Sequence, residues 1–136
     1  MIQTINRHAM IRILAACTLL ALSAPVFAGD GAKEAATAAT HAGFAAKSTE
    51  LQLVHMHLHH AINCLVGPKG EDFDSEQADP CKGQGEGAIP DTWNPEKRKM
   101  LESALASAKQ GLASDDLKAA QKAAEVTEST LRSMSM

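Results

Sequence analysis

Hydrophobic and polar positions recur along the chain with helical spacing, most clearly over residues 50–66. With successive residues 100° apart, one side of this segment carries a conventional apolar stripe of Leu51, Val54, Leu58, Ala61, Ile62 and Leu65. The opposite side is not polar, since it carries Leu53, Met56, His57, His60 and Cys64. A helix of this kind needs cover on both sides, so the rest of the chain is expected to pack around it.

Three further segments have the same periodicity. Alanine-rich residues 32–47 form the first, with Asp30 as the expected cap. Asn94 and Pro95 are typical of the first positions of a helix, which then runs from 96 to 110 and stops at Gly111. Residues 114–116 cap the last helix, whose apolar stripe is Leu117, Ala120, Ala124, Thr127, Leu131 and Met134.

These segments predict an all-α fold, an up-down four-helix bundle made of two αα-hairpins over 30–66 and 94–134. A shift of 66 residues lays Leu51 on Leu117 and Leu65 on Leu131, which indicates an architectural repeat. One continuous helix over 32–66 is the alternative to the first hairpin. The connection at 67–93 is rich in glycine and proline and is expected to be neither helix nor strand, with Phe73, Ile89 and Trp93 as its apolar anchors.

Residues 1–28 have the pattern of a secretory signal peptide, with Arg7 and Arg12, an apolar run and small residues before a cleavage point after Ala28. A lipoprotein signal at Cys17 is the less favoured alternative. We therefore expect a periplasmic or secreted protein with one domain over 29–136. Cleavage would remove two of the 13 basic and none of the 16 acidic residues, leaving a formal charge of −5, which argues against nucleic acid and anionic membrane as partners.

Two cysteines, Cys64 and Cys81, remain after such cleavage. An even pair in an exported chain predicts a disulfide. This bond would hold the 67–93 connection against the far side of the central helix, over His57 and His60. Reduced thiols with these two histidines would instead form a zinc site, which the oxidising compartment disfavours.

The histidines are the strongest sign of chemistry, because imidazole is the commonest transition-metal ligand in proteins. His55 and His59 are four residues apart on one flank of the central helix, a spacing that can place two ring nitrogens on one metal. His41 and His55 lie equally far from the turn near Ser48, so an antiparallel hairpin puts them at the same height. The predicted site for copper, nickel or zinc is therefore His41, His55 and His59, with His57, His60 and Met56 as secondary candidates.

The chain resembles the small histidine-bearing periplasmic metal-binding proteins that fold as four-helix bundles. The resemblance is carried by the signal peptide, the alanine-rich helix pairs, and His41, His55 and His59 at helical spacing. It implies metal sequestration or sensing. The chain departs from that pattern in concentrating its histidines in one helix and in its cysteine-bearing loop.

Two alternatives stay open at this point. In the first, the histidines pack and hydrogen-bond under the loop of a structural or interaction module; in the second, the bundle holds noncovalent haem. Because no Cys-x-x-Cys-His motif is present, covalent c-type haem attachment is excluded. No arrangement of a nucleophile with a histidine base stands out, so we expect a protein that is not an enzyme.

Overall fold

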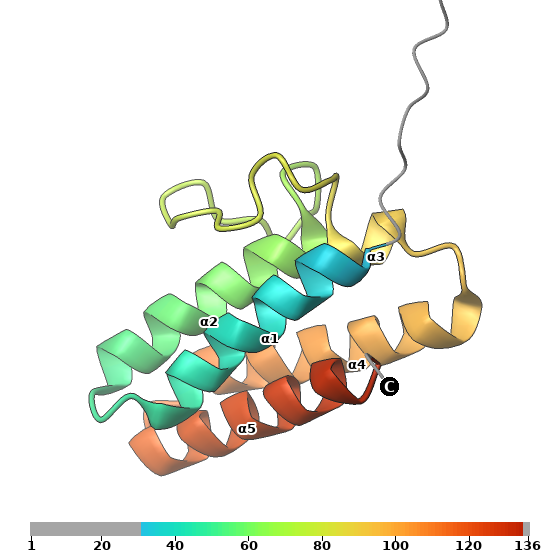
Figure 1. Ribbon diagram of the computed structural model, residues 1–136. Coiled ribbons are helices and arrows are strands. Elements are labelled where there is room, and N and C mark those ends of the chain that lie inside the picture. Colours follow the sequence, from blue (N-terminus) through green and yellow to red (C-terminus); the bar gives the residue numbers. More distant parts are fainter. Residues whose placement is uncertain (1–30, 135–136) are drawn as a thin grey trace, which may run out of the picture.

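The computed structural model describes residues 31–134, and these residues form helices with no strands among them (Figure 1). The helices are α1 (Ala32–Lys47), α2 (Leu51–Val66), α3 (Ala88–Asp91), α4 (Pro95–Leu112) and α5 (Leu117–Ser133). The described chain is thus all-helical and compatible with a helical bundle. The expected signal peptide, its alternative at Cys17 and the Asp30 cap lie outside the described residues.

Local capping explains where the helices begin. The side chain of Asn94 accepts hydrogen bonds from the backbone N–H groups of Glu96 and Lys97, with Pro95 at the first helical position. Asp116 likewise accepts a hydrogen bond from the N–H of Ala119 at the start of α5. Both caps stand where the sequence pattern predicts them.

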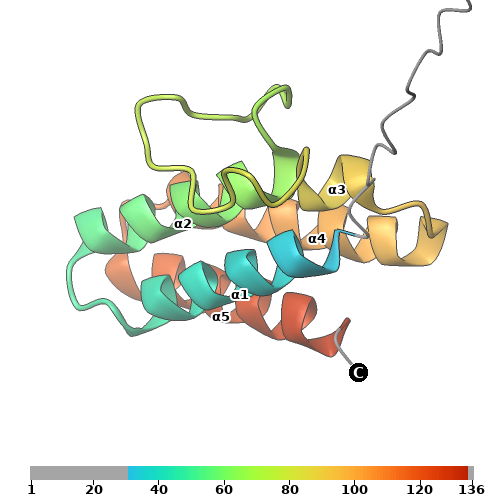
Figure 2. The same cartoon turned by 45° about the horizontal axis from the view of Figure 1, so that its top comes forward.

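The long helices pack through small residues. α1 contacts α2 and α5, and α4 contacts α5 and α2 (Figures 1 and 2). Several alanines on each of α1, α4 and α5 are fully or almost fully buried, together with large residues such as Leu58, Leu65 and Leu101. Because alanine projects only a methyl group, helix backbones approach closely and the apolar stripe of α2 is covered.

Gly111 does not end α4, contrary to the sequence prediction. It lies inside the helix and is buried. A Cβ atom at Gly111 would lie 2.6 Å from Cδ1 of Leu58, so the residue gives room to a core leucine on α2. The glycine is therefore needed for packing and does not mark a helix stop.

The segment between α2 and α4 runs beside α2 (Figure 2). A disulfide and a set of hydrogen bonds fasten it to the end of that helix. A disulfide joins Cys64 to Cys81, as the sequence predicts. The buried Asn63 amide donates to the carbonyl oxygens of Asp74 (2.9 Å) and Ala78 (3.1 Å) and accepts from the N–H of Asp74 (2.9 Å). One covalent bond and three hydrogen bonds therefore place this segment.

Three expectations for the 67–93 connection were wrong. It contains the short helix α3, which includes Pro90 at a position where a helix of one turn does not need its missing N–H. Trp93 is 82% exposed and is not an anchor, whereas Ile89 packs against the core. The connection does not cover the whole outer side of α2 either, since Leu53 is 40% exposed.

Among the described residues, none of the helices combines the length and the apolar character needed to cross a membrane.

Candidate metal centre

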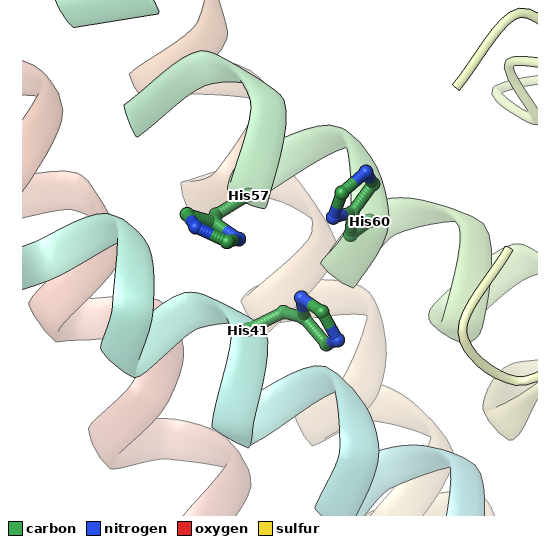
Figure 3. Close-up of side chains that lie close together, drawn as sticks. All are labelled: His41, His57 and His60. Atoms are coloured by element: carbon green, nitrogen blue, oxygen red, sulfur yellow. The ribbon is translucent and has the colours of Figure 1, made fainter. Parts of the chain in front are cut away.

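Three imidazole rings meet between α1 and α2 (Figure 3). His41 comes from α1, and His57 and His60 come from α2, where a spacing of three residues places them on one face. The ring centroids are 5.1 Å apart for His41 and His60 and 5.7 Å apart for each of the other two pairs. We call these three residues the histidine triad.

The distances between the candidate ligand atoms of the triad are larger than those of an occupied metal site. One candidate ligand atom from each residue lies within 4.8 Å of the other two. A tetrahedral ion bound at about 2.0–2.1 Å needs ligand nitrogens about 3.3 Å apart. The three rings would therefore have to move closer together to bind such an ion.

Each ring of the triad has an unsatisfied nitrogen. The Nδ1 atoms of His41, His57 and His60 are buried and have no hydrogen-bond partner. A buried polar atom without a partner costs free energy, and three such atoms in one cluster are exceptional for a folded protein. The arrangement is explained if these nitrogens serve a ligand that is bound between the rings.

The electrostatics of the triad keep the rings neutral. Burial lowers the pKa of His41, and the neighbouring charges of His60 and His57 lower it further. Burial also lowers the pKa of His57, and burial followed by the charges of His57 and His59 lowers that of His60. Neutral imidazole is the form that binds a metal, because its lone pair is free.

An aromatic side chain forms one wall of the triad. The ring of Phe44 lies 5.6 Å from that of His41 and 5.4 Å from that of His57, yet Phe44 remains 49% exposed. Phe44 was not among the residues predicted from the sequence. Its position three residues after His41 on the same helix was the signal that could have found it.

The site that the sequence predicts at His41, His55 and His59 is not assembled. Nε2 of His55 lies 3.0 Å from the carbonyl oxygen of Ser114, at the turn between α4 and α5. Nδ1 of His59 lies 3.3 Å from Oδ2 of Asp74 in the α2–α3 connection. Both rings therefore lie against oxygen atoms of other segments. The structure instead groups His41, a primary candidate, with the secondary candidates His57 and His60. Met56 is partly buried, one helical turn before His60.

The described part of the chain also has a cavity of about 470 Å³ away from the triad. Its lining includes the apolar side chains of Val66, Ile89 and Leu105. Arg98 and Glu102 also line it. Arg98 is engaged there, since its guanidinium donates two hydrogen bonds to the carbonyl oxygen of Thr92. No histidine lines this cavity, so it is separate from the candidate metal centre.

Lowered histidine pKa values predict that the metal-free protein loses stability in mild acid. The unfolded chain takes up protons near the ordinary histidine pKa of 6.5, whereas the folded triad resists them. The contribution to stability is therefore complete above that pH and is lost as the pH falls through the lower folded pKa values. Chemical unfolding in the presence of a chelator, between about pH 7.5 and about pH 5.5, measures this loss.

The control for this prediction is a variant with His41→Gln, His57→Gln and His60→Gln, which keeps His55 and His59. We expect its stability to change less over the same pH interval than that of the unaltered protein. Equal pH dependence in the two proteins would contradict the prediction.

Together, the fold and the triad define an all-helical protein with a three-histidine cluster that can hold a metal ion. Comparisons of the chain with models of known protein families, with curated proteins and with solved structures found no match.

Proposed function

We propose that this protein is an exported, non-catalytic helical bundle that binds a transition-metal ion through His41, His57 and His60, for sequestration or sensing. In this proposal the four long helices form an up-down bundle of two hairpins, and the first hairpin holds the ion. The observation that carries the proposal is the set of three buried Nδ1 atoms without hydrogen-bond partners, on rings that face one another.

The physical argument rests on how these nitrogens differ from those of the other two histidines. His55 and His59 have an oxygen partner each, as histidines in a structural role usually do. The triad has instead three nitrogen atoms available as metal ligands, and they come from α1 and α2, which pack against each other. A bound ion could take one nitrogen of each ring as a ligand at the same time.

The matched test compares two double variants, His57→Ala with His60→Ala, and His55→Ala with His59→Ala. Each loses two histidines from α2, and only the first removes ligands of the triad. Protein purified without a histidine tag is titrated with copper, nickel and zinc by calorimetry. We expect the unaltered protein and the second variant to bind one ion per chain, and the first variant to lose binding.

A thermal melt gives an independent readout. An ion present at about 100 times its dissociation constant stabilises the folded state by about 2.7 kcal/mol, which raises the melting temperature by roughly 10 °C or more in a domain of this size. The proposal fails if no ion produces this rise, or if the first double variant responds as strongly as the unaltered protein. The absence of a Soret band from the absorption spectrum of the purified protein would exclude the haem alternative.

A further inference from the structure

The identity of the ion follows from the charge of its surroundings, provided that the triad binds a metal as proposed. The three ligands are neutral imidazoles, and no Asp, Glu or Cys of the described chain joins them within ligand distance. The triad therefore offers lone pairs without negative charge.

Moving a divalent ion from water into this site costs more free energy than moving a monovalent one. The cost of moving an ion out of water grows as the square of its charge, so two charges cost about four times as much as one. The unsatisfied Nδ1 atoms are shielded from solvent, and the ring of Phe44 contacts two of the three imidazoles. With no carboxylate or thiolate among the ligands to offset its charge, a divalent ion is stabilised less here than in a site with anionic ligands, and a monovalent ion loses less hydration on entering.

A soft ligand lies within one helical turn. Met56 precedes His60 by four residues on α2, and side chains with that spacing are neighbours on a helix surface. Thioether ligands select copper(I), whereas they add little for zinc or nickel. Three imidazoles, with a thioether four residues from one of them on the same helix, are a ligand set that suits a soft monovalent cation.

We propose that the histidine triad selects copper(I) over divalent ions, with the thioether of Met56 as an additional ligand. Copper(I) accepts three or four ligands without requiring anionic ones, so it leaves only one positive charge between the helices. The ion is the cargo of the protein and takes part in no reaction there.

The test is a set of competition titrations of the purified full chain. Copper(I) is supplied anaerobically as its acetonitrile complex against the chromophoric chelator bicinchoninate. Copper(II), zinc(II) and nickel(II) are titrated separately against chelators of known affinity. We expect one copper(I) per chain and a dissociation constant lower than that of each divalent ion by about a thousandfold or more.

Met56→Leu is the sharper variant, because leucine keeps the size and helix propensity of methionine. We expect it to weaken copper(I) binding on the order of tenfold and to leave zinc(II) binding unchanged. Met100→Leu, on α4, is the matched control and is expected to change neither. Equal weakening of both ions by Met56→Leu, or no weakening of copper(I), would overturn the role of Met56.

The outcomes separate this inference from the function on which it rests. If a divalent ion binds as tightly as copper(I) and the His57→Ala, His60→Ala variant abolishes that binding, the preference for copper(I) is refuted and the metal-binding function stands. If no ion binds at all, both the preference for copper(I) and the metal-binding function are refuted.

Discussion

Replacing Asn63 with aspartate is expected to lower the free energy of unfolding by roughly 3 kcal/mol. The side chain of Asn63 is completely buried, and its amide donates to the carbonyl oxygens of Asp74 and Ala78. Aspartate has almost the same shape but no amide donor. A second carboxylate oxygen would face two carbonyl oxygens, and a negative charge would be buried without a cation.

The same substitution at Asn94 is the control for this experiment. Asn94 only accepts hydrogen bonds, from two backbone N–H groups at the start of α4, and aspartate does this equally well. Urea unfolding of the two variants and the unaltered protein gives the comparison. A loss for Asn63→Asp no larger than that for Asn94→Asp would show that the Asn63 bonds do not hold the connection in place.

Removing the disulfide with Cys64→Ala and Cys81→Ala is expected to lower the free energy of unfolding by about 3 kcal/mol. The bond closes a chain segment with a sequence separation of 17, so without it the unfolded chain gains conformational freedom. Both cysteines are replaced together, so that no free thiol remains to bind metal or to link two molecules. Urea unfolding under non-reducing conditions measures the change.

Metal binding is the second readout of this double variant. The triad stands on α1 and α2, and none of its residues belongs to the connection that the disulfide fastens. We therefore expect the variant to bind the metal with nearly unchanged affinity. If affinity and stability fell together in proportion, the connection and not the helix pair would be what holds the rings.

The positions of the long helices follow from local signals in the sequence. The apolar stripes, the Asn94 and Asp116 caps and the turn residues at 48–50 act over a few residues, and the structure places helices at those points. The Cys64–Cys81 disulfide could also be predicted from the sequence, since the predicted domain over 29–136 contains two cysteines and each has one possible partner. These features require no knowledge of what lies across the core.

Features that depend on contact with a residue of another helix or loop could not be predicted from the sequence. Gly111 matched a helix stop, but its absent side chain makes room for Leu58 of α2. Trp93 matched an apolar anchor and is exposed, while Asn63 gave no signal and holds the connection through three hydrogen bonds. For Gly111 and Asn63 the deciding atoms belong to residues that are not their neighbours in the chain.

The sequence by itself determined that histidines would crowd one helix at the height of His41 on its neighbour. Only the tertiary structure decided which of them meet, because that depends on the rotation of α2 about its axis. His55 and His57 differ by 200° around the helix, so packing against α1, α4 and α5 turns His55 toward Ser114 and His57 toward His41. Helical periodicity orders residues around one axis, whereas the direction that each face takes is set by the burial of the apolar stripe against all its neighbours.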